Sequence, residues 1–98
     1  MNFEIAPKST EIRLKWDDAK LYCFSLDIDG KTGWRLPTKE ELNEIYESVN
    51  DFVHGDYYWS STEFTDSCAW GQCMNTGSQD YTTKNFGRVY ARAIRSTV

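Results

Sequence analysis

The 98-residue chain has only two prolines, one histidine and three cysteines, and it contains neither a long apolar run nor a run of basic residues. A membrane-spanning helix needs about 20 consecutive apolar residues, so the sequence predicts no transmembrane segment. Without a basic run, and with a formal net charge of −4, the chain lacks the electrostatic features that attract nucleic acid or an anionic membrane. We therefore expect neither of these partners, whereas the acidic balance favours a basic protein.

The N-terminal residues lack the apolar stretch of a secretory signal peptide, which predicts a cytoplasmic protein. In a reducing compartment Cys23, Cys68 and Cys73 would remain thiols, and their odd number also argues against complete pairing. If residues 68–73 form one regular strand, its terminal cysteines point to opposite faces about 16 Å apart, too far for a disulfide. A turn or bulge at Gly71 would remove this objection, so that alternative stays open.

Aromatic side chains are abundant instead, at 15% of the sequence, within a total of 40% hydrophobic residues. No residue type dominates, and this composition is typical of a globular domain. The length favours one domain with one core, so we expect residues 1–98 to fold as a single unit.

The clearest local signal is a helix start at Thr38. Thr38 is a favourable N-cap, and Glu41 follows three residues later, as in a capping box. Pro37 precedes the cap, where it can pack against Leu42. The predicted buried stripe of this helix comprises Leu42, Ile45, Tyr46 and Val49.

Apolar residues at helical spacing also predict an earlier helix, over about residues 16–26. Asp17 and Asp18 fall in its first turn, where the helix dipole favours negative charge. The segment between the two helices, residues 27–33, is dense in turn-forming residues, which predicts a polar turn.

No complete set of metal ligands is present. Asp27 and Asp29 resemble the opening of a calcium loop, but the fifth position is Lys31 and the twelfth, which requires a bidentate Glu, is Thr38. One histidine, His54, and three irregularly spaced cysteines match no zinc pattern. We predict neither a metal nor a cofactor.

Short strands are predicted elsewhere. Phe3 and Ile5 alternate with polar neighbours and predict a first strand. The β-rich segments of the second half are residues 58–62, about 68–75 and 89–96, with polar connections over residues 75–80 and 83–85. Val89, Ala91 and Ala93 share one face of the last strand, which suggests close packing against the helices. Two helices packed on an antiparallel sheet make an α+β fold.

Several of these segments, in this order, carry a resemblance to a known family. They are Trp16, Ala19, Tyr22, Cys23, residues 34–38, Glu41, Leu42, residues 58–62, Ala69, Trp70 and residues 92–95. In them the chain resembles the C-terminal domain family of Legionella collagen-like proteins, from about residue 16 to residue 95. The resemblance implies a C-type-lectin-like α+β fold with paired terminal strands and a loop-rich second half that presents a binding surface. It implies no reaction.

Members of this family usually occur as modules of secreted or surface proteins, so the resemblance also implies adhesion and ligand display. The absence of a signal peptide instead favours a small phage-type accessory or inhibitor protein in the host cytoplasm. A virion or cell-surface location is the alternative.

The related formylglycine-generating enzymes share this broad fold and use a cysteine pair. Here Cys68 and Cys73 are spaced as Cys-x4-Cys, and no second signal indicates an activated thiolate. His54 has no serine or cysteine at a motif spacing. We therefore interpret the cysteines as buried structural thiols and predict no catalytic residue.

The tryptophans and three arginines within the matched segments are assigned to the scaffold. The tryptophans are predicted to pack in the core, each with a hydrogen-bond partner for its indole nitrogen. They are Trp16, Trp34, Trp59 and Trp70. Three arginines, Arg35, Arg92 and Arg95, are predicted to pair with carboxylates.

The remaining candidates form a polar, acidic and aromatic surface in the second half. They are Asp56, Tyr57, Glu63, Asp66, Asn75, Gln79, Asp80 and Tyr81. Tyrosine is favoured at interfaces because it offers a large, rigid contact area together with a hydroxyl group. We predict a non-catalytic domain that binds a protein here. The alternative is a metal-independent carbohydrate-binding adhesin or tail module, since the motifs of calcium-dependent lectins are absent.

Overall fold

The computed structural model describes residues 2–48, 51–52 and 56–97. In chain order the elements are β1 (Phe3–Ile5), a 3-10 turn (Lys8–Thr10), β2 (Ile12–Leu14), α1 (Trp16–Ser25), β3 (Trp34–Arg35), α2 (Lys39–Ser48), β4 (Tyr57–Glu63), β5 (Cys68–Cys73), β6 (Gln79–Thr83), β7 (Val89–Ala91) and β8 (Ile94–Ser96). The fold is therefore α+β, as predicted.

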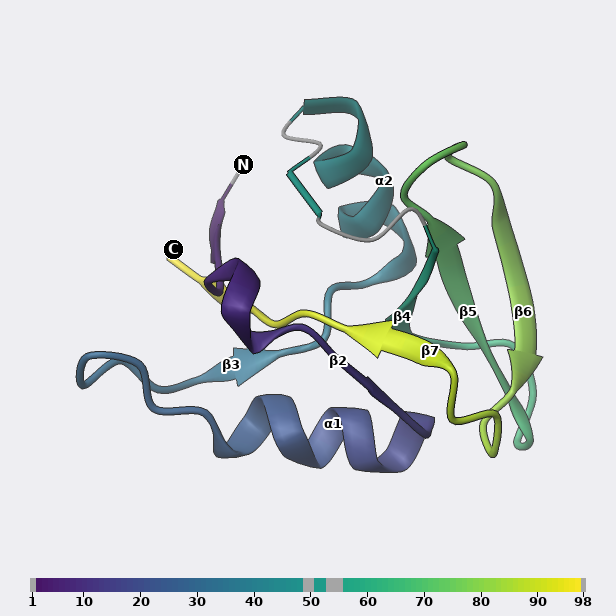
Figure 1. Ribbon diagram of the computed structural model, residues 1–98, viewed down its shortest axis with the longest axis horizontal. Coiled ribbons are helices and arrows are strands. Elements are labelled where there is room, and N and C mark those ends of the chain that lie inside the picture. The colour runs from purple at the N-terminus through teal and green to yellow at the C-terminus, as the bar shows by residue number, and fades with distance from the viewer. Residues whose placement is uncertain (1, 49–50, 53–55, 98) are drawn as a thin grey trace.

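The strands form two sheets, one in the order β1-β8-β3 and the other in the order β2-β7-β4-β5-β6. Neighbouring strands are antiparallel except β4 and β7, which run parallel. Phe3 lies opposite Ser96 and Ile5 opposite Ile94, so the terminal strands lie side by side (Figure 1). This pairing of the terminal strands confirms what the family resemblance implied.

The two helices cover opposite sides of the sheet region, with α1 below and α2 above in Figure 1. Alternate residues of β7 enter two different apolar clusters: Val89 and Ala91 pack in the cluster that includes α1, and Tyr90 packs in the cluster that includes α2. Ala93 joins the α1 cluster. The predicted packing of these small residues against the helices is confirmed for α1, whose buried residues share their cluster.

The start of α2 has the predicted capping box. The Thr38 hydroxyl accepts a hydrogen bond from the Glu41 N–H at 3.1 Å, and the Glu41 carboxylate accepts one from the Thr38 N–H at 2.8 Å. Arg35 in β3 donates two further hydrogen bonds to the same carboxylate, at 2.7 and 2.9 Å. The hydrogen bonds from Arg35, together with those at Thr38, lower the pKa of Glu41 from 4.5 to about 2.

The predicted apolar stripe of α2 is present where the structure describes it. Leu42 and Ile45 are fully buried, and Tyr46 packs against their cluster. Val49 lies outside the described residues. Helix α1 begins at Trp16 and ends at Ser25, in agreement with the predicted range.

The segment after α1 is the predicted polar turn. The Asp27 carboxylate accepts a hydrogen bond from the Gly30 N–H at 3.0 Å, and Ile28 bridges to Lys31. Asp29 and Gly30 have positive φ angles of 53° and 82°, a conformation that aspartate and glycine adopt more readily than most residues.

The predicted last strand, residues 89–96, is wrong as one element. It is divided into β7 and β8, which belong to different sheets, and the chain changes sheet at Arg92 and Ala93. Arg92 is only 3% exposed; it donates to the Ala6 carbonyl at 2.9 Å and pairs with Glu11 at 3.1 Å. These long-range contacts fix the chain where it passes from β7 to β8. No local sequence pattern predicts them.

The connections predicted over residues 75–80 and 83–85 are also partly wrong, because Gln79, Asp80 and Thr83 belong to β6. This strand pairs regularly with β5, from Gln79 opposite Gln72 to Thr83 opposite Cys68. It is an edge strand of its sheet and carries mostly polar residues, so its sequence resembles a loop.

Three of the four tryptophans have the predicted core role. The indole nitrogens of Trp16, Trp34 and Trp59 donate to the carbonyls of Ser60, Lys31 and Leu14, at 2.8, 2.9 and 2.8 Å. Trp70 differs, because it is only partly buried and packs among surface aromatic residues. The predicted arginine pairs are confirmed: Arg35 with Glu41, Arg92 with Glu11, and Arg95 with Glu4.

Candidate binding site

Four of the eight predicted site residues line one pocket of about 270 Å³. They are Asp56, Tyr57, Asp80 and Tyr81. We call this the acidic pocket. Asp56 directly precedes β4, Tyr57 begins it, and the other two residues belong to β6, so two segments more than 20 residues apart in the sequence meet at this pocket.

The floor of the acidic pocket depends on a glycine. Trp59, Gly71 and Asp80 lie in one row across β4, β5 and β6, and Gly71 carries no side chain between the other two. A Cβ atom at Gly71 would lie 2.8 Å from the Tyr58 carbonyl oxygen, too close for any other residue without a shift of the backbone. The close approach of β4 therefore requires glycine at this position, which is one of the residues that line the pocket.

Two carboxylates are displayed at the pocket. Asp56 accepts a hydrogen bond from the Tyr57 N–H at 2.8 Å, and Asp80 accepts one from the Tyr81 N–H at 2.8 Å. Both aspartates are exposed, and neither has a cationic partner within salt-bridge distance in the described part of the chain. The backbone thus orients these carboxylates without neutralising them.

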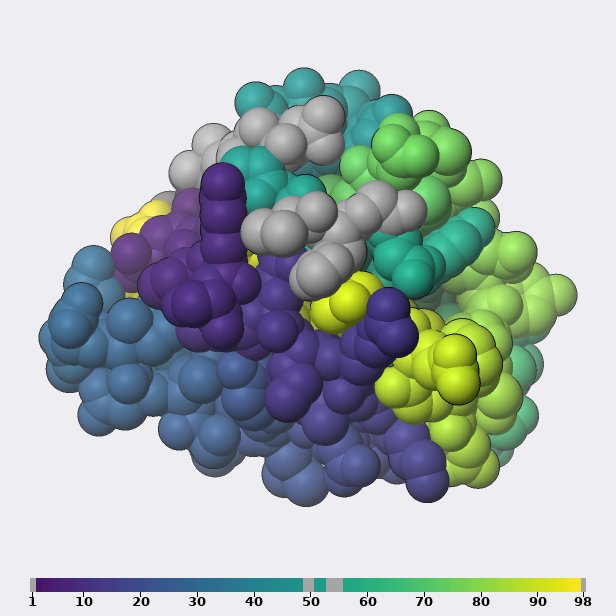
Figure 2. All heavy atoms as spheres, in the orientation of Figure 1, coloured from purple at the N-terminus to yellow at the C-terminus, as the bar shows by residue number. Residues whose placement is uncertain are grey.

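The pocket contains two residues that the sequence analysis missed, Phe86 and Arg88. They lie in the β6–β7 loop, which in Figure 2 (yellow-green) adjoins the start of β4 (teal) and β6 (light green) on the same face. Phe86 is 45% exposed. An aromatic residue flanked by Asn85 and Gly87, both turn formers, is the signal that would have found it.

A second feature lies on the opposite side of β6. The Tyr81 ring stacks on Phe64 with centroids 3.8 Å apart, and it meets the edge of Trp70 at 5.4 Å. We call these three residues the aromatic cluster. The Lys39 ammonium lies 3.7 Å from the centroid of the Trp70 ring. Phe64 remains 46% exposed and Tyr81 45% exposed, so the cluster presents two rings to solvent.

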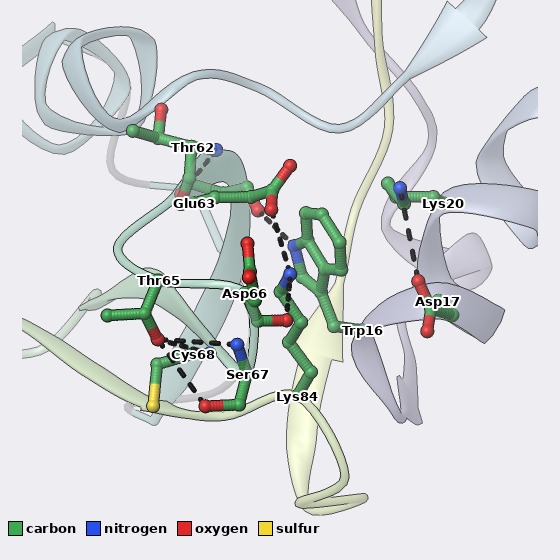
Figure 3. Close-up of polar contacts among 11 residues, drawn as sticks. Trp16, Asp17, Lys20, Thr62, Glu63, Thr65, Asp66, Ser67, Cys68 and Lys84 are labelled. Carbon is green, nitrogen blue, oxygen red and sulfur yellow. Dashed lines mark hydrogen bonds and ion pairs between the residues drawn. The ribbon is translucent and has the colours of Figure 1, made fainter.

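Glu63 and Asp66 are brought together away from the acidic pocket. Figure 3 shows the Lys84 ammonium between the Glu63 carboxylate and the Asp66 carbonyl, at 2.8 Å from each. The same ammonium lies 4.4 Å from the centroid of the Trp16 ring. The hydrogen bond from Lys84 lowers the pKa of Glu63. The Glu63 carboxylate therefore has an internal partner.

Gln79 is also held by the scaffold. Its amide donates to the Lys39 carbonyl at 2.9 Å and to the Gln72 side chain at 3.1 Å, and Gln72 in turn donates to Asn43 at 3.1 Å. These bonds tie β5 and β6 to α2. Asn75, the remaining predicted site residue, is exposed in the turn after β5.

The family model of the Lcl C-terminal domain matches residues 4–95. The chain belongs to this family. The match includes the capping box, the aromatic cluster and every residue of the acidic pocket, so the scaffold and the candidate site are parts of one Lcl C-terminal domain. No curated protein matches the chain.

The cysteines of this Lcl C-terminal domain lie in three environments. Cys23 is buried, and burial raises the pKa of its thiol to about 12. Cys68 and Cys73 begin and end β5 and are half-buried, not buried as predicted. Burial raises the pKa of Cys73, but hydrogen bonds from the Thr76 hydroxyl and from nearby N–H groups outweigh this effect, so the net shift is downward.

Two further observations concern metals and membranes. Within residues 2–48, 51–52 and 56–97, no three histidine, cysteine, aspartate or glutamate residues come together in a group able to hold a metal ion. Neither helix described there has the length and apolar character needed to cross a bilayer. His54 lies outside the described residues.

Proposed function

We propose that this Lcl C-terminal domain is a non-catalytic binding domain that recognises a protein partner through the β5–β6 end of the molecule. The exposure of the aromatic cluster is the observation that carries the proposal. Phe64 and Tyr81 each leave nearly half of their surface in solvent while stacked on one another. Aromatic residues of this kind supply much of the binding energy at protein interfaces.

The rigidity of the surroundings supports the same proposal. The Gln72–Gln79 amide network fixes β5 and β6 against α2, and Lys84 fixes the β4–β5 turn against the β6–β7 loop. A surface that is ordered before binding loses less conformational entropy when the partner docks. In this proposal binding is itself the activity, as in a phage-type accessory or inhibitor protein that changes what its partner does.

A carbohydrate ligand is the second candidate. The acidic pocket combines aromatic walls from Tyr57 and Phe86 with two oriented carboxylates. Apolar walls with a few placed polar groups are the general character of small-molecule sites, and sugar rings offer both an apolar face and hydroxyl donors. An adhesin or tail module would use the pocket in this way without a metal.

The experiment begins with capture of partners from a lysate of the native host and their identification by mass spectrometry. The purified partner is then titrated against wild type, Phe64→Ala and Tyr81→Ala by calorimetry. Phe24→Ala is the matched control, because Phe24 is also an exposed phenylalanine, at 78%, but lies on α1. We expect each cluster variant to weaken binding by tenfold or more, on the order of 1.4 kcal/mol, and the control to bind like wild type.

Two results would contradict this proposal. Wild-type affinity in both cluster variants would move the interface elsewhere, and loss of binding in Phe24→Ala would move it to α1. A glycan array in which a sugar binds wild type, and no longer binds Tyr57→Ala, would favour the carbohydrate candidate instead.

A further inference from the structure

We propose that the acidic pocket receives a single lysine or arginine side chain of the protein partner, with its cationic head against Asp56 and Asp80. This inference rests on the proposed function and specifies how the partner is recognised. It is carried by the charge of the pocket, its walls and a comparable arrangement elsewhere in the same molecule.

The charge of the pocket is unbalanced by one unit. Asp56 and Asp80 contribute two negative charges, and Arg88 contributes one positive charge. Each aspartate uses one oxygen to accept a neutral backbone N–H, and no cationic group among the described residues lies within salt-bridge distance of either carboxylate. One cationic head would bring the pocket to neutrality, whereas a neutral ligand would leave the excess negative charge in place.

The walls are compatible with the stem of such a side chain. Tyr57 and Phe86 are aromatic residues of the pocket lining, and Phe86 is 45% exposed. Lysine and arginine pack their methylene stems on apolar surface and keep the charged head at a polar rim. The volume of about 270 Å³ lies below the usual range for small-molecule sites, about 300 to 1,000 Å³, which favours one side chain over a cofactor-sized ligand.

The molecule already contains a lysine held by these kinds of group. The Lys84 ammonium pairs with the Glu63 carboxylate at 2.8 Å while it lies 4.4 Å from the centroid of the Trp16 ring (Figure 3). A cation between a carboxylate and an aromatic face gains from both interactions. In the acidic pocket the carboxylates and the rings are present, and the side chain that would complete the arrangement comes from the partner.

The test uses small probes of known chemistry. Nα-acetyl-lysine methylamide and Nα-acetyl-arginine methylamide are titrated through the millimolar range into the ¹⁵N-labelled protein, with the norleucine analogue as the uncharged control. We expect a cationic probe to cause saturable shifts of the Tyr57, Gly71 and Thr82 amide signals. The norleucine analogue should bind with at least tenfold lower affinity. The Asp56→Asn, Asp80→Asn double variant should weaken binding tenfold or more, and Asp66→Asn should leave it unchanged.

Equal binding of the norleucine probe, shifts away from the pocket, or the absence of shifts with both cationic probes would overturn the inference. Saturable pocket shifts with a neutral methyl glycoside instead would assign the pocket to carbohydrate. The proposed function is separable: if the double aspartate variant binds the partner like wild type while Tyr81→Ala does not, the protein interface stands and the pocket assignment falls.

Discussion

The helix-start region, residues 34–42, and the acidic pocket differ in how their charges are satisfied. In the helix-start region the Glu41 carboxylate receives hydrogen bonds from Arg35 and from the Thr38 backbone. In the acidic pocket Asp56 and Asp80 each accept the N–H of the next residue, and within the part of the chain that the structure describes neither has an ion pair. Both regions contain acidic, basic and aromatic residues, so the types of residue alone do not separate them.

This difference indicates different roles. A charge that is paired within its own domain contributes to the stability of the fold, and its removal leaves the partner group unpaired. A charge without an internal partner adds little to folding and remains available to another molecule. Mutations should therefore reduce stability in the helix-start region and reduce binding in the acidic pocket.

The largest expected effect is on stability, in Trp34→Ala. Trp34 is 3% exposed, packs with α1 and donates its indole N–H to the Lys31 carbonyl. Removal of a buried tryptophan should lower the free energy of unfolding by about 3 to 5 kcal/mol. Chemical denaturation monitored by circular dichroism measures this change. A variant with the stability of wild type but no affinity for the partner would reverse the roles assigned to the two regions.

Glu41→Gln should have the next largest effect. Its folded pKa of about 2 lies below the ordinary 4.5, so the stabilisation is present above pH 4.5 and is lost as the pH falls toward 2. A shift of this size corresponds to roughly 3 kcal/mol, but Arg35 is 40% exposed and solvent screening reduces the value, so we expect about 1 to 2 kcal/mol at pH 7.

The measurement for Glu41→Gln is thermal unfolding between pH 7 and pH 2. Glutamine can still accept the Thr38 N–H, but it loses the charge and one of the two oxygens that accept from Arg35, so the variant removes the ion pair. Wild type should lose its advantage over the variant as the pH falls through this range. A constant difference at every pH would show that the charge of Glu41 has no part in stability.

Thr38→Ala should cost about 1 kcal/mol, because it removes the hydroxyl that accepts the Glu41 N–H at the first turn of α2. Thr38→Ser keeps the hydroxyl and provides the control. Equal melting temperatures for wild type and Thr38→Ala would contradict a capping role.

The smallest effect on stability is expected in the acidic pocket. Asp56→Asn and Asp80→Asn should each change the free energy of unfolding by less than about 0.5 kcal/mol, because both side chains are exposed and lack an ion pair in the described part of the chain. Denaturation curves measure this directly. A loss of 1 kcal/mol or more would place these aspartates in the scaffold, and the contrast between the two regions would disappear.

Much of the fold was predictable because its signals are local. The capping box requires only Thr38 and Glu41, three residues apart, and the helical stripe of α2 requires only its own spacing. The division between β7 and β8 was not predictable, since it depends on contacts of Arg92 with Ala6 and Glu11, more than 80 residues away. Strand β6 was missed because an edge strand tolerates a loop-like, polar sequence.

The candidate site was predictable only in part, for the same reason. Asp56, Tyr57, Asp80 and Tyr81 stood out as polar and aromatic residues next to loops, and they line one pocket. Glu63 stood out equally, but its partner Lys84 lies 21 residues further along the chain, and only the folded structure reveals that its charge is already used. The types of residue can indicate a candidate binding surface. Which of its charged side chains already have a partner within the domain can be read only from the three-dimensional structure.

The pairing of β1 with β8 has a practical consequence for how the domain can be attached. Both ends of the described chain leave the molecule from neighbouring strands, on the side of the molecule away from β5 and β6 (Figure 1). A tag, a surface linker or a host polypeptide joined at either terminus would therefore emerge at one anchoring point and leave the acidic pocket and the aromatic cluster uncovered. Insertion into a loop of a carrier protein would require the carrier to bridge only the short gap between two adjacent strands.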